Sequence, residues 1–505
     1  MGNPFPGYRR CACIVAVLMG SGALAQSARA QHGLDAFHRL NEINKASLIM
    51  VVEQEIVPRS LGTQIASALA EVIADAEVPG APRSGDYLQV EQLLIAAGGP
   101  EVTRLHSGRS RQDIGATMRR LFLRDDLLVA AEALNAARES LLEKAEAHAD
   151  AIMPAYTWGV QAQPISFGHY LLGYSEALAR SAERLRQAWA RLNLSPLGAA
   201  ALGTSSFPVN RPRLAELLGF DGVIENSLDA NQISPVDSGV ELVSIAASSA
   251  LTINLLLADI TTQYAQTRPW LVLSEGASTG VSSIMPQKRN PTGIVRLRAL
   301  GSTVLGDAQS YLVQAHNVGS GMHDYKGDQP NHVLQQAGTM FESLASLIDQ
   351  LELDEERALD EVNAEYSTTT ELANTLQREA GVAFRVGHHF ASELVNFGRG
   401  NGLRPSEIPY AEAQRIYSDA ARTLGMSSVE LPLDETSFRR ALRAENMVRT
   451  SKGLGGPQPA EVRRMLAEQT SALDWDRQWL GDTRDRLAGA TERLDEAFEQ
   501  LRTGP

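Results

Sequence analysis

One short polar segment gathers several side chains that could do chemistry together. Ser282 and Ser283 supply hydroxyls, Lys288 supplies an ammonium group and Asn290 supplies a carboxamide. Prolines interrupt the segment, and each one removes a backbone donor and disfavours helix in the residue before it. We therefore expect an exposed loop, the kind of segment in which functional side chains concentrate.

These residue types suit the removal of a proton from a carbon next to a carboxylate. That carbon is a weak acid, so the anion it forms needs cations and hydrogen-bond donors where the charge develops. A serine hydroxyl can act as the base when nearby cations and amides lower its pKa. Ser282 is the candidate base, and Lys288 and Asn290 are the candidate stabilising groups. Glycines earlier in the loop would let it close over a substrate.

Two further segments carry groups suited to binding a carboxylate. Residues 106–113, HSGRSRQD, contain Ser107, Arg111 and Gln112, and an arginine can hold a carboxylate through paired N–H donors. For Arg109 in the same segment, an ion pair inside the N-terminal domain is as well supported as a role in binding. Thr157 offers one more hydroxyl. Together these groups predict a cationic pocket for a small dicarboxylate.

The overall charge limits the partners of the chain. Its formal net charge is −14 over 505 residues, which argues against a nucleic-acid partner because phosphate binding needs a basic face. Both cysteines, Cys11 and Cys13, lie near the N-terminus. If that end is removed, no thiol remains for a disulfide, a nucleophile or a metal site.

The first thirty residues have the composition of an export signal. Two arginines precede an apolar run over 11–25, and residues 28–30, Ala-Arg-Ala, have the small side chains of a cleavage site. We expect cleavage near Ala30, with Ala25 as the alternative, and export to the periplasm. Without a working signal the protein would be cytoplasmic. The run is too short to span a bilayer, so no stable membrane insertion is expected.

Long helical patterns follow, and strand-like alternation is scarce. We expect an all-α fold in which a long central bundle lies between two smaller helical domains. The expected ranges are 31–125 for the N-terminal domain, 126–370 for the bundle with a signature loop at 274–292, and 371–505 for the C-terminal domain.

Two helices in this scheme have a distinctive pattern. Residues 241–265 are apolar on most faces, which indicates a helix surrounded by several neighbours, as inside an oligomer. Near the C-terminus the second stripe of a coiled coil is interrupted by Arg477 and Arg484, so we expect a helix docked on the body of the protein. The stripe that is present consists of Leu473, Leu480, Leu487, Leu494 and Leu501.

At these motifs the chain resembles the argininosuccinate lyases of the fumarase/aspartase superfamily. Residues 106–113 are similar to the family's HTGRSRND, and residues 285–291, MPQKRNP, are similar to its signature loop. NSLDA at 226–230 and GLGGPQP at 453–459 also match. The motifs occur in the family's order and cover residues 35–470, most of the chain.

The resemblance implies a fumarate-releasing homotetramer whose sites each combine three subunits, with no metal and no other cofactor. Ser282 would take the Cβ proton, while Lys288 and Asn290 would stabilise the aci-carboxylate intermediate. The residues expected to bind the small dicarboxylate substrate are Ser107, Arg111, Gln112, Thr157 and Ser283.

Several positions depart from the family pattern. Where the family's YTHLQ has a histidine that assists catalysis, this chain has Trp158, and Val160 replaces the glutamine. Gln112 stands in place of the usual asparagine. The YNRDLQ segment, associated with holding the guanidinium end, becomes residues 321–326, GMHDYK. The elimination half of the site is thus largely kept, and the arginine-recognition half is not.

We therefore expect a carbon–nitrogen lyase for an N-substituted aspartate, either argininosuccinate-like or another aminodicarboxylate such as an aminopolycarboxylate. Two alternatives stay open. The same scaffold could serve a cycloisomerase or a C–O lyase. The chain could also be a dicarboxylate-binding homologue whose catalysis is impaired because Trp158 replaces the histidine.

Overall fold

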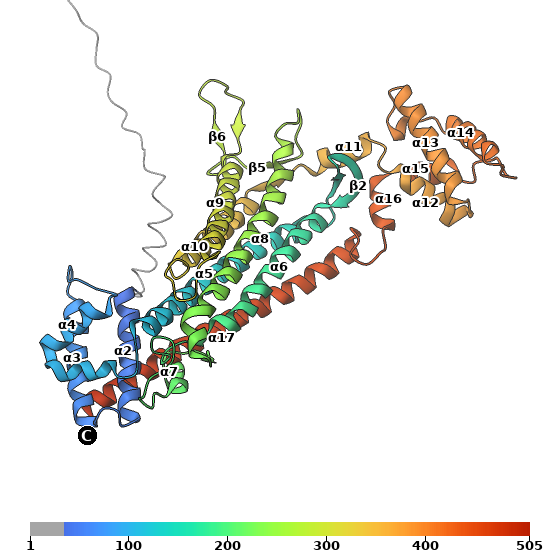
Figure 1. The fold of residues 1–505 in the computed structure, drawn as a ribbon. Coiled ribbons are helices and arrows are strands. Elements are labelled where there is room, and N and C mark those ends of the chain that lie inside the picture. Colours follow the sequence, from blue (N-terminus) through green and yellow to red (C-terminus); the bar gives the residue numbers. More distant parts are fainter. Residues whose placement is uncertain (1–34, 505) are drawn as a thin grey trace, which may run out of the picture.

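The computed structural model describes residues 35–504, so the expected export signal lies outside the described residues. A bundle of long helices lies between an N-terminal helical unit and a C-terminal one (Figure 1). Strands are few and short. The all-α fold with a flanked central bundle is therefore confirmed.

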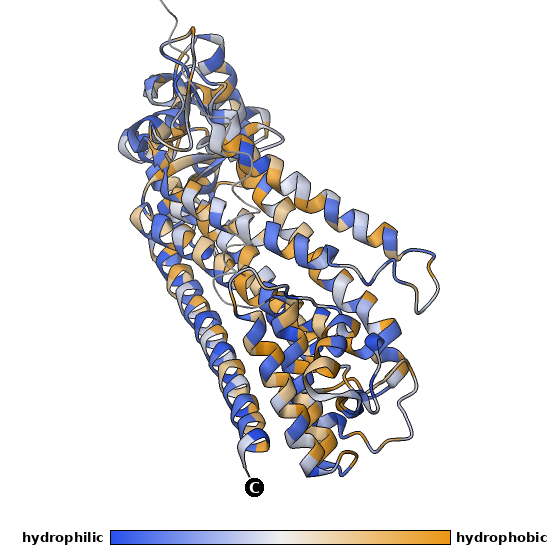
Figure 2. Ribbon diagram, turned by 90° about the vertical axis from the view of Figure 1, so that its left-hand side faces the viewer, coloured by the Kyte–Doolittle hydropathy of each residue, from blue (hydrophilic) through white to orange (hydrophobic). Residues whose placement is uncertain are grey.

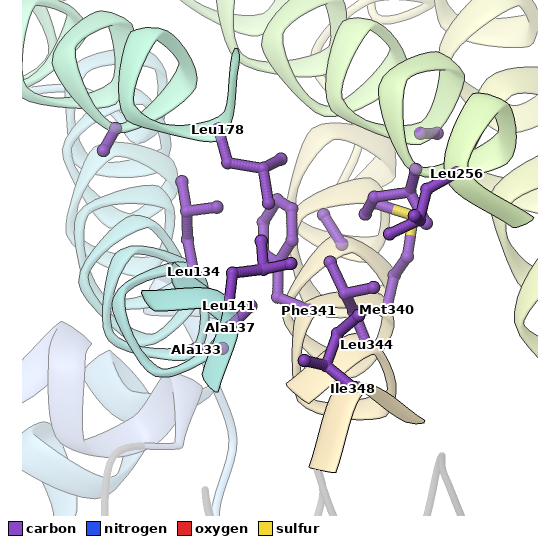
Figure 3. Packing of buried hydrophobic residues seen from close by; sticks show 14 of the residues in the cluster. Ala133, Leu134, Ala137, Leu141, Leu178, Leu256, Met340, Phe341, Leu344 and Ile348 are labelled. Carbon is purple, nitrogen blue, oxygen red and sulfur yellow. The ribbon is translucent and has the colours of Figure 1, made fainter. Parts of the chain in front are cut away.

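The bundle is built from helices of 21 to 45 residues. Their inward faces form one buried cluster, in which Leu141 of the first helix and Phe341 and Leu344 of the fifth pack together (Figure 3). Full burial of each such side chain contributes roughly 1.5–3 kcal/mol. The bundle helices are α5 (Arg111–Ala147), α6 (Phe167–Leu192), α8 (Ser234–Gln263), α9 (Thr292–Ala315), α10 (Gln329–Asp349) and α17 (Pro459–Thr503).

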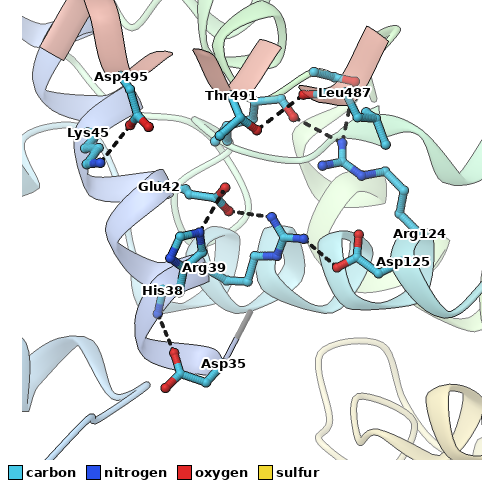
Figure 4. Close-up of polar contacts among 12 residues, drawn as sticks. Asp35, His38, Arg39, Glu42, Lys45, Arg124, Asp125, Leu487, Thr491 and Asp495 are labelled. Carbon is cyan, nitrogen blue, oxygen red and sulfur yellow. Dashed lines mark hydrogen bonds and ion pairs between the residues drawn. The ribbon is translucent and has the colours of Figure 1, made fainter. Parts of the chain in front are cut away.

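The N-terminal unit has a second buried cluster, which includes Phe37 and Leu69 and extends to Phe498 of α17. Ion pairs fasten this unit to the bundle (Figure 4): Arg39 lies 2.5 Å from Asp125 of α5. Helix α5, which runs from Arg111 to Ala147, belongs to both sides of the boundary expected at 125/126. The elements of the unit are α2 (Ala36–Glu53), α3 (Arg59–Ala76), α4 (Tyr87–Gly98) and the 3-10 helix η1 (Pro100–His106).

The C-terminal unit surrounds a third cluster, with Phe390, Tyr417 and Phe438 at its centre. It is followed by α17, which returns along the bundle to the N-terminal unit (Figure 1). The leucine stripe of α17 faces the first two clusters, which confirms a docked helix. The elements of this unit are α11 (Glu355–Ala364), α12 (Thr369–Ala380), α13 (Phe384–Gly400), η3 (Pro405–Glu407), α14 (Tyr410–Thr423), α15 (Glu435–Ala441) and α16 (Ala444–Thr450).

Within residues 35–504, four two-stranded pairs connect the helices. Three are antiparallel and one, β3 with β4, is parallel. The pairs are β1 (Ile152–Thr157) with β2 (Val160–Ser166), β3 (Leu194–Ser195) with β4 (Gly222–Val223), β5 (Leu271–Leu273) with β8 (Leu351–Leu353), and β6 (Gly280–Val281) with β7 (Arg289–Asn290). Between them lie α7 (Arg211–Leu217) and the π-helical turn η2 (Asp229–Ile233).

Helix α8 is the most apolar of the long helices. With η2 it is long and apolar enough, by length and composition, to cross a membrane, a test that core helices of soluble proteins also pass. Only half of its most apolar window is buried, and Leu251 and Leu255 are 53% and 64% exposed. Figure 2 shows hydrophobic residues interleaved with polar ones along the bundle helices. One chain alone therefore does not bury this helix on all sides. The apolar pattern led us to expect neighbours on several sides, as inside an oligomer.

Candidate active site

The signature loop forms a short β-hairpin that projects from the bundle above α9 (Figure 1). Its base is held where the backbone N–H of Gly293 donates to the carbonyl of Ser278 across 2.8 Å. A Cβ at Gly293 would lie 2.7 Å from that of Ser278, so only glycine fits this approach. The tip is open to solvent, and Ile284 is 83% exposed.

Ser282 lies at the start of this tip with backbone donors directed at its side chain. Its Oγ accepts hydrogen bonds from the N–H groups of Ile284 at 3.4 Å and Met285 at 3.1 Å. Donors to an oxygen stabilise its ionised form more than its neutral form. The local turn therefore favours the alkoxide that a serine base requires.

The other polar groups of the loop fall into two kinds. Arg289 and Asn290 support the hairpin: the first pairs with Glu275 at 2.6 Å, and the second donates to the carbonyl of Gly280 at 3.2 Å. Lys288 and Ser283 are exposed, and neither side chain has a partner within residues 35–504. The loop thus presents to solvent an ammonium group and a hydroxyl that have no partner among residues 35–504.

A second group of candidate residues lies at the N-terminus of α5. Ser107, Arg111 and Gln112 surround this helix end, where the backbone N–H groups and the helix dipole favour an anion. Arg111 is exposed, and its guanidinium has no partner in the part of the chain that the structure describes. Ser107 has no side-chain hydrogen bond there either.

The helix end is fixed by the buried carboxylate of Asp113. This side chain accepts a hydrogen bond from the backbone N–H of Ser110 at 2.8 Å. The Ser110 side chain in turn caps the backbone of the first turn, so the two residues form a capping box. The Asp113 carboxylate also accepts from Gly198 at 2.9 Å and Ala200 at 3.0 Å. Asp113 therefore ties the start of α5 to the 198–200 segment, and Gln112 next to it is held in place.

Arg109 and His106 serve the interior of the N-terminal unit. Arg109 is buried, donates to Ser47 at 3.0 Å and Asn44 at 2.9 Å, and lies over the ring of Tyr87. Burial and the charge of Arg109 lower the pKa of His106 to about 4, so this imidazole is neutral at pH 7. Arg109 thus has an internal role, made of hydrogen bonds rather than an ion pair.

Sequence reasoning left out two residues at this end of the site: Lys326, which contacts Gln112, and Gln232, which contacts Lys326. The ammonium group of Lys326 donates to Oε1 of Gln232 at 2.6 Å and to Oε1 of Gln112 at 3.4 Å. Their motifs could have indicated them, because Gln232 follows NSLDA by two residues and Lys326 ends GMHDYK.

Thr157 and Trp158 lie at the tip of the β1–β2 hairpin. The turn has positive φ at both central residues, +56° at Trp158 and +72° at Gly159, as in a type I′ turn. Trp158 is fully exposed, at 102% of its reference area. An indole is a hydrogen-bond donor and not an acid in the neutral pH range, so this residue cannot replace a histidine in proton transfer.

One chain keeps the residues at the start of α5 apart from both the hairpin tip and the signature loop. Helix α5, which begins at Arg111 next to Gln112 and ends before the hairpin, has 37 residues and at 1.5 Å per residue is roughly 55 Å long. Helix α8 has 30 residues between Gln232 and the signature loop, or roughly 45 Å. The structure therefore brings Gln112 and Lys326 together, but places Ser282 and Thr157 far from both within a single chain.

The fold and the polar loop define a lyase of the fumarase/aspartase superfamily. A family model described as "Lyase" matches residues 15–306, and one described as "Argininosuccinate lyase C-terminal" matches residues 366–449, the range of the third buried cluster. The argininosuccinate lyase of Methanosarcina acetivorans is 30% identical over 91% of this chain and 92% of its own length. Argininosuccinate lyase 2 of Agrobacterium fabrum is 32% identical over 88% of this chain and 87% of its own length.

Among solved structures, an EDDS lyase in complex with formate has a TM-score of 0.81 and 29% identity over 92% of both chains. A 3-carboxy-cis,cis-muconate lactonizing enzyme from Pseudomonas putida shares the fold, with a TM-score of 0.65 and 19% identity over 88% of this chain and 97% of its own. The chain belongs to the argininosuccinate lyase family, and it is a carbon–nitrogen lyase.

Proposed function

We propose that this lyase releases fumarate from an N-substituted aspartate whose leaving group is an aliphatic amine rather than arginine. The observation that carries the proposal is the geometry of Ser282, whose Oγ accepts hydrogen bonds from two backbone N–H groups on a loop that also carries the exposed Lys288. A hydroxyl in such surroundings can lose its proton and act as a base. That one of the similar structures is an EDDS lyase supports a substrate other than argininosuccinate.

The proposed reaction is a β-elimination. The Ser282 alkoxide takes the Cβ proton, and the electron pair moves into the adjacent carboxylate as an aci-carboxylate that Lys288 and Asn290 stabilise. The pair then returns to form the C=C bond while the C–N bond breaks. The products are fumarate and the amine, and the serine carries the proton until it is lost to solvent.

The absence of a histidine at Trp158 fits an amine leaving group. An aliphatic amine has a pKa of roughly 10, like a lysine side chain, so at pH 7 the substrate nitrogen already carries a proton. It can depart as a neutral amine without a general acid from the enzyme. An N-substituted aspartate of the aminopolycarboxylate class meets this requirement.

The proposal includes a homotetramer in which each site combines segments of three chains. Ser107, Arg111 and Gln112 would come from one chain, Thr157 from another and the signature loop with Ser283 from a third. The distances along α5 and α8 support this division. The exposed apolar residues of α8, such as Leu251 and Leu255, would be covered by the partners.

We further propose that the protein is exported after cleavage near Ala30, because residues 1–30 have the composition of a signal. An exported lyase would meet amine-substituted dicarboxylates outside the cytoplasm. Determining the N-terminal residue of protein from cells would test this, and a chain that keeps its first thirty residues would contradict it.

The reaction is tested in reverse with purified protein, fumarate and a panel of amines and amino acids. The proposal predicts loss of fumarate and formation of an N-substituted aspartate with at least one amine. If arginine alone reacted, the proposed leaving group would be wrong. If no amine reacted and no N-substituted aspartate released fumarate, the enzyme proposal itself would fail. Formation of a lactone from an unsaturated dicarboxylate would instead favour a cycloisomerase.

A further inference from the structure

The tip of the β1–β2 hairpin carries an aromatic residue that breaks two local rules. Trp158 takes the first central position of the type I′ turn, where asparagine or aspartate is usual because bulky side chains disfavour a positive φ. Its whole side chain is exposed to water, and nearby Tyr156 and Val160 are 41% and 66% exposed. Residues in such unfavourable conformations concentrate at functional sites, so the indole at this tip needs a functional explanation.

The hairpin holds Trp158 in a fixed place. Thr157 pairs with Val160 directly before the turn. The side chain of Gln161 donates to the carbonyl of Val362 at 3.3 Å and to the hydroxyl of Ser367 at 3.2 Å. These contacts tie the hairpin to α11 and to the segment that follows it. The indole is therefore presented by a braced hairpin rather than by an unsupported loop.

The signature loop has an apolar tip of its own. Val281 and Ile284, which flank the two serines, are 78% and 83% exposed, and Met285 is 40% exposed. Because both tips are this exposed, neither covers the other within residues 35–504 of one chain. Clusters of exposed apolar side chains mark surfaces that another molecule covers. Each of the two hairpins therefore presents such a surface next to a residue proposed for the site.

The proposed site requires these two tips to meet. There, Thr157 of one chain and Ser282 of another contact the same small dicarboxylate, so the two backbones approach to within the length of that substrate. Trp158 directly follows Thr157, and Val281 directly precedes Ser282. The apolar side chains of the two tips therefore come within reach of each other at the edge of the site.

We propose that Trp158 of one chain packs against Val281 and Ile284 of another chain's signature loop and holds that loop closed over the substrate. The inference rests on the proposed function. The apolar contact keeps water from the site while the intermediate carries its negative charge. Trp158 is thus a positioning residue: at the place of the family's usual histidine, the indole acts in loop closure instead of proton transfer.

Cross-linking tests the contact between chains. A full-length chain with Cys11→Ser and Cys13→Ser has no thiol, and Trp158→Cys and Ile284→Cys are introduced into separate copies of it. The two proteins are refolded together, and a short bis-maleimide is added in the presence of succinate. We expect far more covalent dimer in the mixture than in either protein alone. The control mixture replaces Ile284→Cys with Leu424→Cys, an exposed position in the C-terminal unit, and should give no dimer.

A chain that carries both cysteines distinguishes the alternative arrangement. Cross-linking within this chain, combined with no dimer in the mixture of single variants, would overturn the contact between chains. No cross-link in either arrangement would overturn the contact altogether. Neither readout depends on turnover, so both separate this inference from the proposed function.

Kinetics tests what the contact does. Trp158→Ala and Ile284→Ser should each lower kcat/KM for an N-substituted aspartate by ~10-fold, because each removes a large apolar side chain from the closed contact. The double variant should lose no more than the weaker single variant, since both changes break the same contact. The control is Phe384→Ala, which removes a half-exposed aromatic side chain from the C-terminal unit and should leave kcat/KM unchanged.

Two further variants separate closure from proton transfer. Trp158→Phe keeps an aromatic side chain and should retain most of the activity, whereas Trp158→His should lose as much as Trp158→Ala. Higher activity of Trp158→His than of the wild type, or additive losses in the double variant, would overturn the role of Trp158 in closure. No turnover by the wild type would instead count against the proposed function.

Discussion

The backbone N–H of Met285 donates to Oγ of Ser282 across 3.1 Å, and the N–H of Ile284 approaches the same oxygen at 3.4 Å. The signature loop therefore supplies its own donors to the atom proposed as the base. Such donors favour the ionised serine before any other chain contributes to the site. What the loop lacks within one chain is the substrate-binding groups at the N-terminus of α5.

Mixing two inactive variants should restore activity if the site combines different chains. Ser282→Ala removes the proposed base, and Arg111→Ala removes a proposed carboxylate-binding group at the N-terminus of α5. In assemblies formed from equal amounts, about a quarter of the sites would draw both intact groups from the appropriate chains. The measurement is fumarate release after the two proteins are unfolded and refolded together.

Each variant refolded alone is the control for this experiment. Recovery well above the sum of the separate activities is expected, together with a tetrameric mass by light scattering. A monomeric protein with full activity would contradict the shared site. A mixture that stays inactive although it assembles would do the same.

The buried ion pair between α5 and α17 should contribute far more to the free energy of unfolding than the exposed ion pair next to it. Arg138 is fully buried and lies 2.6 Å from Asp476, which also pairs with Arg186 of α6 at 2.5 Å. Asp476→Ala would leave Arg138 buried without a counter-charge, a loss of about 3–5 kcal/mol in the free energy of unfolding. Urea denaturation would measure it.

The matched control is Glu139→Ala, which breaks the exposed pair of Glu139 with Arg477 between the same two helices. Its expected cost is below about 1 kcal/mol. Similar losses in the two variants would show that the buried pair does not hold α17 against the bundle.

The stability of the N-terminal unit should fall at acid pH through Glu42. Burial alone would raise the pKa of Glu42, but contacts with His38 and Arg39 lower it to about 2 (Figure 4). Because the folded-state pKa lies below the unfolded value, this group stabilises the protein above about pH 4.5 and loses its contribution as the pH falls towards 2. The loss can reach ~3 kcal/mol.

Urea denaturation at pH 3, 4 and 6 would measure this dependence, with Glu42→Gln as the comparison. We expect the variant to be less stable than the wild type at pH 6 and to show a flatter dependence below pH 4.5. Parallel curves for the two proteins would contradict the role of Glu42.

The helical architecture could be predicted because its causes are local. The apolar pattern that becomes α8 and the leucine stripe of α17 each lie within a single segment. The contact of Lys326 with Gln112 could not be predicted in this way, because 214 residues separate the two and no pattern links them. The return of α17 to the first two clusters could not be predicted either, because long-range packing decides the position of this helix.

For the site, sequence motifs indicated the candidate residues but not their spatial grouping. HSGRSRQD and MPQKRNP each form a local group, at the start of α5 and on the β6–β7 hairpin. Their separation by the length of α8 follows from the fold alone. The internal role of Arg109 likewise depends on Asn44 and Ser47, which lie on α2.

The rate of fumarate release by Ser282→Ala tests the central claim most directly. The substrate is an N-substituted aspartate that the wild type cleaves, and the matched control is Ser67→Ala, which removes an exposed hydroxyl from α3. We predict that Ser282→Ala lowers kcat by roughly 10²- to 10⁴-fold while succinate still binds and Ser67→Ala stays fully active. A Ser282→Ala protein with the kcat of the wild type would contradict the account.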